Sequence, residues 1–303
     1  MIDLSVEIAG VTLRNPVMPA SGCFEILPEQ ERVLDPAILG AIVNKTIFLK
    51  ARAGNPPPRI RETPGGMLNS IGIPGEGIEA FIEYKLGALS ALGPPLIVSL
   101  AGNSVEEFCR IARIIEDTGK AQFLELNLSC PNLNDGLHWA TSKETLFEVV
   151  SAVTEAVSLP VAAKLSPSVT DIVEMATAAC KAGAAALSLV NTFKGLAIDI
   201  EKRRPFLGNI TGGLSGPAIK PLALYYVYEV YRSVDIPIIG MGGIAGWRDA
   251  VEFILAGATA VAVGMYNFVN PLVMAEVIGG IDRYLAENSF SSVKEIIGLA
   301  HRI

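Results

Sequence analysis

Residues 123–132 combine a strand-like pattern with a cysteine at the point where that pattern ends. From residue 124 to 129, leucine alternates with Glu, Asn and Ser, and this period of two predicts a β-strand with one apolar and one polar face. Helical patterns flank the strand and would cover it, so we expect its polar face to point into an enclosed interior. Pro131 prevents simple continuation, which leaves Cys130 on the turn after the strand. A lone cysteine is more often an inert buried side chain, so its neighbours decide whether the thiol does chemistry.

Two lysines interrupt otherwise apolar segments of the sequence, Lys45 near residues 41–44 and Lys164 after residues 161–163. Lysine is almost never buried without a partner, so we expect an anionic ligand or an electron-rich ring to contact each ammonium group. The side chains of Asn69, Asn127 and Asn191 add amide donors and acceptors, which suit a flat heterocycle with ring N–H and C=O groups.

Short apolar runs separated by helical segments would position these side chains. We predict strands at residues 17–20, 41–46, 96–100, 123–129, 161–166, 184–191, 237–241 and 260–264. Helices follow, with N-terminal signals at Ser104, Ser142 and Asp171, and Glu107 stands in the capping-box position relative to Ser104. Strand–helix alternation indicates parallel units, and eight of them in about 250 residues predict an α/β fold of the (β/α)8 TIM barrel type.

The rest of the chain is predicted to decorate this barrel. Residues 3–8 and 11–13 predict an N-terminal β-hairpin, and the long connections 47–95 and 192–237 predict enlarged loops at the C-terminal face. No linker or charge block divides the chain, so residues 1–303 are expected to form a single domain. A doubly wound open sheet is the alternative, but it would show a glycine-rich dinucleotide turn after the first strand, and none is present.

Glycines follow the last two predicted strands, Gly242-Gly243 after one and Gly264 after the other. Barrels commonly bind phosphate there, because backbone N–H groups can approach an anion closely, although glycines also make tight turns. A phosphate grip beside two lysines and several amides predicts a phosphorylated aromatic cofactor next to a small polar substrate. Flavin mononucleotide (FMN) suits this description better than a sugar phosphate.

Composition excludes several classes of protein. Half of the 303 residues are hydrophobic. The net charge of −7 argues against nucleic acid as a binding partner, because binding to its phosphates needs clustered Lys and Arg. No apolar run approaches the roughly 20 residues that span a membrane, and the N-terminus does not have the pattern of a signal peptide. The four cysteines show no C-x-x-C spacing, so we expect a cytoplasmic chain with no metal site of its own.

Ordered motifs along nearly the whole chain resemble class 1 dihydroorotate dehydrogenases. The segments that carry the resemblance are 15–16, 20–22, 43–46, 54–59, 69–72, 127–132, 164–167, 191–192, 211–217 and 240–244. The resemblance implies FMN-dependent oxidation of (S)-dihydroorotate to orotate in pyrimidine (UMP) biosynthesis. It makes Cys130 the general base that removes the proton and FMN the hydride acceptor.

The resemblance also assigns binding residues. Those implied for the substrate are Lys45, Asn69, Ser70, Ile71, Gly72, Ile73, Asn127, Asn191 and Thr192. Those implied for FMN are Ser21, Lys45, Thr46, Asn103, Asn127, Lys164, Val190, Gly216, Gly242, Gly243, Gly264 and Met265. Lys164 is expected beside the pyrimidine edge of the flavin, where its charge would stabilise the reduced ring.

Segments 51–59 and 211–221 resemble class 1B, whose catalytic subunit passes electrons to NAD through a partner subunit that carries FAD and a [2Fe-2S] cluster. That resemblance implies a heterotetramer of two catalytic and two electron-transfer chains. The alternatives are a homodimeric, fumarate-dependent class 1A enzyme, a redox-silent phosphate-binding isomerase, and an RNA-reducing flavoenzyme that the acidic charge disfavours. The loop at residues 133–139 departs from class 1B, because it lacks the usual lysine and paired glycines.

Overall fold

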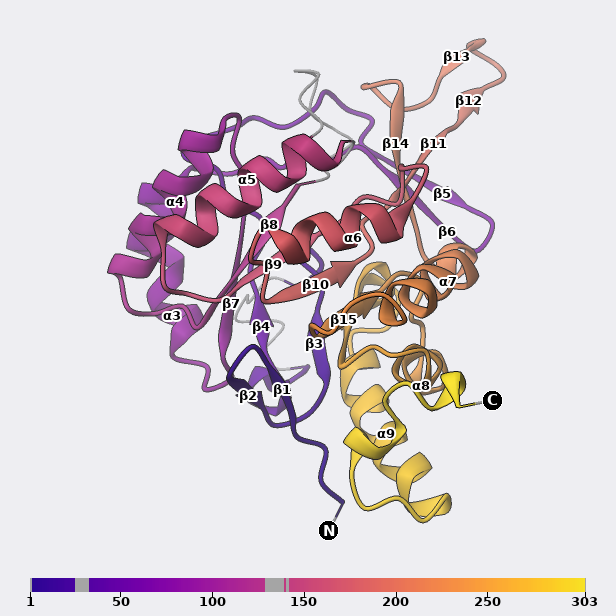
Figure 1. Ribbon diagram of the computed structural model, residues 1–303. Coiled ribbons are helices and arrows are strands. Elements are labelled where there is room, and N and C mark those ends of the chain that lie inside the picture. The colour runs from indigo at the N-terminus through magenta and orange to yellow at the C-terminus, as the bar shows by residue number, and fades with distance from the viewer. Residues whose placement is uncertain (1, 25–32, 129–138, 140–141, 303) are drawn as a thin grey trace.

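The computed structural model describes residues 2–24, 33–128, 139 and 142–302. Eight parallel strands form a barrel at its centre, with helices outside (Figure 1). In order around the barrel they are β3 (Val17–Pro19), β16 (Ala260–Val263), β15 (Ile238–Met241), β10 (Ala186–Leu189), β9 (Val161–Lys164), β8 (Phe123–Asn127), β7 (Leu96–Leu100) and β4 (Ile42–Val43). The Gly40 N–H donates to Val17 O at 2.8 Å and so links the segment before β4 to β3. The predicted (β/α)8 barrel is confirmed, with each strand within its expected range.

In the described part of the chain, six longer helices cover the outside of the barrel. They are α4 (Val105–Asp117), α5 (Lys143–Ala156), α6 (Ile172–Lys181), α7 (Lys220–Tyr231), α8 (Trp247–Leu255) and α9 (Val273–Glu287). Shorter helical segments are α2 (Ile78–Phe81), α3 (Gly87–Ser90), the π-helical η2 (Ile82–Leu86), and the 3-10 turns η1 (Pro36–Ile38), η3 (Pro217–Ile219), η4 (Met265–Phe268), η5 (Val293–Ile296) and η6 (Leu299–His301).

The predicted N-caps of α4, α5 and α6 are confirmed, each with a side-chain oxygen that accepts from a backbone N–H of the first turn. The capping box at α4 forms only in half. Ser104 Oγ accepts from the Glu107 N–H at 3.2 Å, but the Glu107 carboxylate turns to the N–H of Asn103 at 2.9 Å. Glu107 therefore fixes the residue before the cap, at the end of the loop that leaves β7.

Strands β7, β8, β9, β10, β15 and β16 are buried along their whole length, as expected for parallel strands covered on both faces. Most of their side chains are aliphatic, yet Ser99, Glu125 and Ser188 are at most 3% exposed. Buried polar groups need hydrogen-bond partners. The barrel interior therefore contains a polar layer whose members must satisfy one another.

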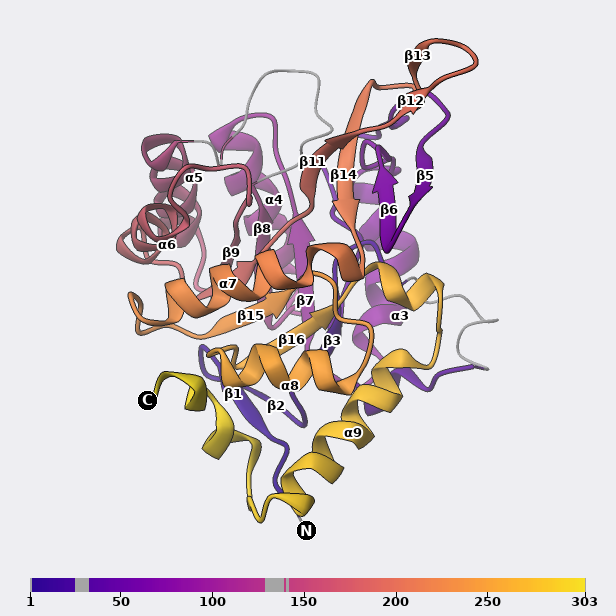
Figure 2. The same ribbon diagram turned by 90° about the vertical axis from the view of Figure 1, so that its right-hand side faces the viewer.

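Additional strands lie at both ends of the barrel. The predicted hairpin forms from β1 (Val6–Ile8) and β2 (Val11–Leu13), and both ribbon views place it at the end opposite the site described below (Figures 1 and 2). At the other end a four-stranded antiparallel sheet stands above the barrel, in the order β11 (Phe193–Leu196), β14 (Thr211–Ser215), β6 (Gly66–Asn69), β5 (Ile60–Thr63). Beyond it, β12 (Ile198–Asp199) and β13 (Arg204–Pro205) form a projecting arm.

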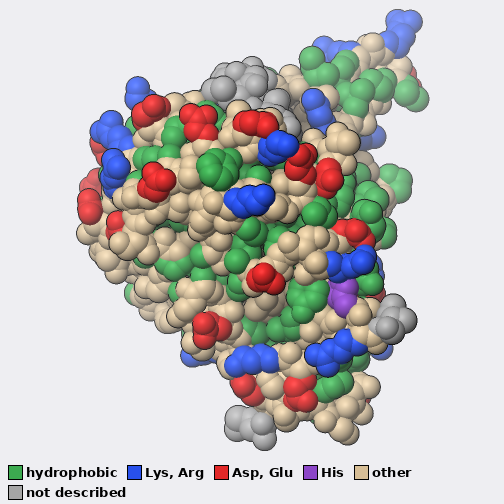
Figure 3. All heavy atoms as spheres, in the orientation of Figure 1, with side chains coloured by type: hydrophobic (Ala, Val, Ile, Leu, Met, Phe, Trp, Pro, Cys, Tyr) green, Lys and Arg blue, Asp and Glu red, His purple; other side chains and the backbone are tan. Residues whose placement is uncertain are grey.

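The sequence predicted only enlarged loops where this antiparallel sheet forms. Residues 66–69 and 211–215 are rich in glycine, which has weak strand propensity, and their pairing joins segments that are about 145 residues apart. Figure 3 shows hydrophobic and basic side chains on the arm, where Ile198 and Ile200 are 53% and 78% exposed. None of the helices in the described part of the chain has the length and apolarity needed to span a lipid bilayer.

Two adjacent glycines in α9 offer a matched test of the packing between α8 and α9. A Cβ added at Gly280 would lie 2.1 Å from Trp247 Cγ, whereas one at Gly279 would meet nothing within 4 Å. We expect Gly280→Ala to lower the free energy of unfolding by about 2 kcal/mol through overpacking. Gly279→Ala should raise it by up to about 1 kcal/mol through helix propensity. Denaturant unfolding followed by circular dichroism measures both, and equal effects would contradict the close contact.

Candidate active site

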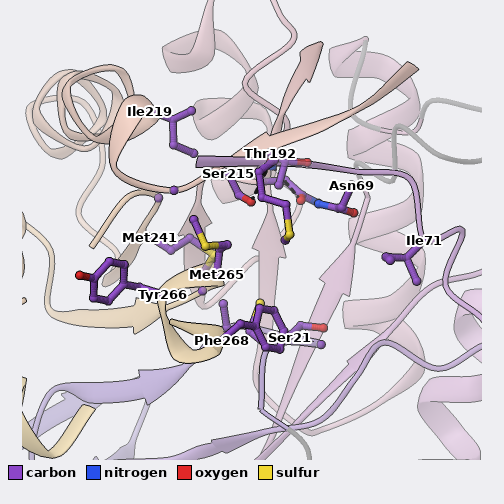
Figure 4. Close-up of a pocket in the computed structure, with 18 of the residues that line it drawn as sticks. Ser21, Asn69, Ile71, Thr192, Ser215, Ile219, Met241, Met265, Tyr266 and Phe268 are labelled. Carbon is purple, nitrogen blue, oxygen red and sulfur yellow. Dashed lines mark hydrogen bonds between the residues drawn. The ribbon is translucent and has the colours of Figure 1, made fainter. Parts of the chain in front are cut away.

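A cavity of about 350 Å3 opens at the carboxyl ends of the barrel strands. Its floor is formed by strand ends, which supply Asn127, Lys164 and Met241, and the antiparallel sheet above contributes Met67 and Ser215. In Figure 4 Asn69, Thr192 and Ser215 lie close together along one wall, and Met241 and Tyr266 lie on the side opposite Ile71. Ligands of (β/α)8 barrels bind at this end of the barrel.

A chain of hydrogen bonds crosses the floor of the cavity and joins side chains at the carboxyl ends of five strands, β3, β4, β7, β8 and β10. Thr46 Oγ1 lies 2.9 Å from both Ser21 Oγ and Ser99 Oγ, and it accepts from Asn127 Nδ2 at 3.0 Å. Asn191 Nδ2 donates in turn to Asn127 Oδ1 at 3.1 Å. The side-chain NH2 group of Asn127 therefore points toward Thr46, and its side-chain oxygen points toward Asn191. A ligand thus meets a preorganised polar surface.

Lys164 has a partner within the protein that the sequence analysis did not identify. Its Nζ lies 3.5 Å from Glu125 Oε1, and the side chains are 6% and 4% exposed. Ser188 Oγ donates to the other carboxylate oxygen at 2.9 Å. Lys164 lines the cavity and Glu125 lies behind it. The alternation of residues 124–129 had already placed Glu125 on the face of Asn127, and a buried lysine needs a counter-charge. Those two facts make Glu125 a candidate partner, and the register between β8 and β9 decides the pairing.

Lys45 differs from the expectation that it is buried within a strand. Strand β4 ends at Val43, so Lys45 follows the strand, and it is an exposed residue on the wall of the cavity. Neighbouring Thr46 is buried and belongs to the hydrogen-bonded floor. The two residues therefore serve different parts of the cavity, with Lys45 able to contact a ligand from the solvent side.

The turn after β15 requires glycine for steric reasons. Gly242 and Gly243 have φ angles of +123° and +79°, and a Cβ on either would lie 2.7 Å from the nearest atom of α7. Among the described residues, no backbone carbonyl accepts from the N–H groups of Gly242, Gly243 or Met265. All three residues line the cavity. The tight-turn interpretation of the glycines is therefore confirmed, and phosphate binding at this turn stays a prediction.

The structure brings most of the predicted site residues to this one cavity. They are Ser21, Lys45, Thr46, Asn69, Ile71, Gly72, Ile73, Asn127, Lys164, Val190, Asn191, Thr192, Gly216, Gly242, Gly243, Gly264 and Met265. Ser70 and Asn103 do not line it. Ser70 is fully buried behind the wall, where it accepts from Asn55 Nδ2 at 3.0 Å, and Asn103 is exposed and bonded to Glu107. Cys130 lies outside the described residues.

Several lining residues were not predicted. Ile60 and Met67 come from the antiparallel sheet, and Tyr266 and Phe268 come from η4. No pattern in the sequence marks them, because their segments approach the cavity only through long-range pairing. Their side chains add aromatic and aliphatic surface to the cavity.

Cys23 also lines the cavity. Burial raises the pKa of its thiol to about 11, and the Lys164 ammonium opposes this shift only in part. Such a thiol is almost entirely protonated at neutral pH and therefore poorly suited to act as a base.

Comparison with known proteins gives full-length matches. The dihydroorotate dehydrogenase family profile matches residues 3–285. The chain is 52% identical over 297 residues to the dihydroorotate dehydrogenase B (NAD+) catalytic subunit of Geobacter sulfurreducens. The matched region covers 98% of this chain and 97% of the relative. Proteins of the same name from Desulforudis audaxviator and Caldicellulosiruptor saccharolyticus are 49% and 45% identical. Those matches cover 99% and 98% of this chain, and 98% and 99% of the relatives.

The raised pKa of Cys23 predicts slow alkylation. At pH 8 the thiolate fraction should be about a hundredfold smaller than for a thiol at the ordinary value of 9.0, and labelling should quicken about tenfold per pH unit up to about pH 11. Iodoacetamide labelling of the native chain, followed by mass spectrometry of the peptide that contains Cys23, measures this. Equal rates in native and unfolded protein at pH 8 would contradict it.

Proposed function

Because the chain belongs to the dihydroorotate dehydrogenase family, and within it to the NAD+-linked B-type catalytic subunits of pyrimidine biosynthesis, we propose that it oxidises (S)-dihydroorotate with bound FMN in the cavity described above. The observation that carries the proposal is the arrangement of that cavity. It has N–H groups suited to an anion at one end and an Asn–Lys polar surface on its floor.

The donor set fits FMN. The turns at Gly242-Gly243 and Gly264-Met265 follow neighbouring strands β15 and β16, so their N–H groups converge on one region suited to the phosphate. Lys164 and Asn127 face the cavity from adjacent strands in direct register and would contact the polar edge of the ring system. Ser21, Thr46, Val190 and Gly216 complete the proposed cofactor site. Asn103 is left out, because it does not line the cavity.

The substrate is proposed to lie between the ring system and the loop that contains Asn69 and Ile71–Ile73. Lys45 would meet its carboxylate, and Asn69, Asn127, Asn191 and Thr192 would bind its ring amide groups. Thr192 N donates to Asn191 Oδ1 at 2.9 Å, which sets the direction of the Asn191 amide before the substrate arrives. Ser70 would act from behind the wall, through its bond to Asn55.

Oxidation of dihydroorotate removes a proton and a hydride from adjacent ring carbons. We propose Cys130 as the general base, since it follows Asn127 by three positions and lies within segment 127–132, by which the chain resembles its family. FMN, when bound, supplies the acceptor for the hydride. The Lys164 ammonium would stabilise the negative charge that the reduced ring carries.

As a catalytic subunit the chain works with a partner subunit. We propose that the partner carries FAD and a [2Fe-2S] cluster, passes the electrons to NAD, and assembles as two catalytic and two electron-transfer chains. We also infer that residues 1–303 act as a single FMN-binding domain, because the cavity walls come from segments spread between Ala20 and Phe268.

One experiment tests the whole proposal. The purified chain should be yellow, with the visible spectrum of FMN, and anaerobic titration with dihydroorotate should bleach it. A colourless chain would instead favour a redox-silent phosphate-binding isomerase. Turnover with fumarate by this chain alone, without an iron–sulfur partner, would favour the homodimeric class 1A form.

Substitution of the proposed base should separate chemistry from cofactor binding. Cys130→Ser is expected to keep FMN but to slow flavin reduction by dihydroorotate on the order of 10²-fold or more at neutral pH, because serine is a weaker base. Anaerobic stopped-flow absorbance measures the rate, with Cys23→Ser as the control that should keep it. An unchanged rate in Cys130→Ser would remove this residue from the mechanism.

Loss of the buried ammonium should affect both the cofactor and stability. Lys164→Ala is expected to bind FMN weakly or to leave it unreduced by substrate. It should also lower the free energy of unfolding by about 3 kcal/mol, because Glu125 is left buried without its counter-charge. FMN fluorescence titration and denaturant unfolding measure the two effects. A yellow, reducible and equally stable variant would contradict the assignment of Lys164.

A further inference from the structure

Glu125 is a buried carboxylate that neither the cavity wall nor the proposed chemistry uses directly. It projects from β8 into the barrel interior and is 3% exposed, and both of its carboxylate oxygens have partners, Lys164 Nζ at 3.5 Å and Ser188 Oγ at 2.9 Å. An unpaired charge in such a place is strongly unfavourable, so the two partners are needed for stability. The carboxylate thereby links three neighbouring strands, β8, β9 and β10.

Strand register explains why this carboxylate meets that lysine. Lys164 lies opposite Asn127 on β8 and opposite Ser188 on β10, so Glu125 stands two residues below Asn127 on the same face. The Lys164 side chain therefore has the carboxylate on its inner side and the cavity on its outer side. Ser188 Oγ holds the far oxygen and so fixes the direction in which the carboxylate points.

The length of the Glu125–Lys164 contact leaves Lys164 available to a ligand. A separation of 3.5 Å is longer than the roughly 2.7–2.9 Å of a strong charge-assisted hydrogen bond. An ammonium group has three N–H donors, and within the described residues only this one bond from Lys164 Nζ is found. Attraction to Glu125 thus restrains the ammonium without using all its donors.

We propose that Glu125 is a positioning residue that holds the Lys164 ammonium against the ring of the bound cofactor. This inference rests on the proposed function, since it requires FMN in the cavity. Glu125 touches neither cofactor nor substrate and acts only through Lys164. The carboxylate also balances the charge of the lysine within the buried barrel interior, so the ammonium is held in place by the protein itself.

The test is a double-mutant cycle on FMN affinity, with apoprotein of the full chain titrated with FMN. Glu125→Gln keeps the shape and loses the charge, and should weaken FMN binding about tenfold. In a Lys164→Met background the same change should cause no further loss, because its effect passes through Lys164. Ser188→Ala, a milder change that keeps the charge pair, should weaken binding about threefold. Glu174→Gln breaks the exposed Lys143–Glu174 pair and should leave affinity unchanged.

The midpoint potential of the bound FMN gives a second readout, which a purely structural role would not move. Displacement of the ammonium in Glu125→Gln should lower the potential, in the same direction as Lys164→Met, because the reduced ring loses its positive neighbour. A higher potential would mean that Lys164 stays in place, and would overturn the positioning role. Equal loss of affinity in both backgrounds, or none in either, would also overturn it. Wild-type chain that binds no FMN would refute the proposed function and this inference together.

Discussion

Mutual satisfaction of buried polar side chains at the mouth of the barrel is the constraint on which the site depends. Ser99, Glu125 and Ser188 lie in a layer that water does not reach, so each must find its partner within the protein. The resulting bonds join the ends of strands that are distant in sequence. The amide side chains at the surface of this layer are held in place by hydrogen bonds to it. A ligand therefore meets donors and acceptors whose directions are already set.

Close packing around the turn after β15 adds a second constraint. Helix α7 approaches this turn so closely that Gly242 and Gly243 leave no room for a side chain. Both glycines line the cavity, so the close packing leaves backbone in place of side chains at this part of its wall. One packing feature thus determines both the turn and the adjacent surface of the cavity.

The antiparallel sheet above the barrel determines the shape of the cavity. Strands β6 and β14 pair between Leu68 and Leu214, although they belong to different β-α connections. Their pairing brings Asn69 and Thr192 to one wall, opposite the turns after β15 and β16. A barrel alone offers strand ends and loops, whereas this sheet closes the site from above and adds apolar surface to it.

The sequence by itself determined the barrel, because strand–helix alternation is a local signal repeated eight times. It also determined the cavity residues at the strand ends, because barrel strands all end on the same side, whereas the resemblance to a family supplied those in the connections, such as Asn69 and Gly216. It also marked Lys164, since a lysine in an apolar strand is anomalous wherever the strand lies. Only the tertiary structure decided that Glu125 is its partner and that Asn103 and Ser70 stand away from the cavity. It alone also decided that glycine-rich connections pair as a sheet. These features depend on register and on contacts between distant segments, which are fixed by packing of the whole chain and leave no periodic trace in any one stretch of it.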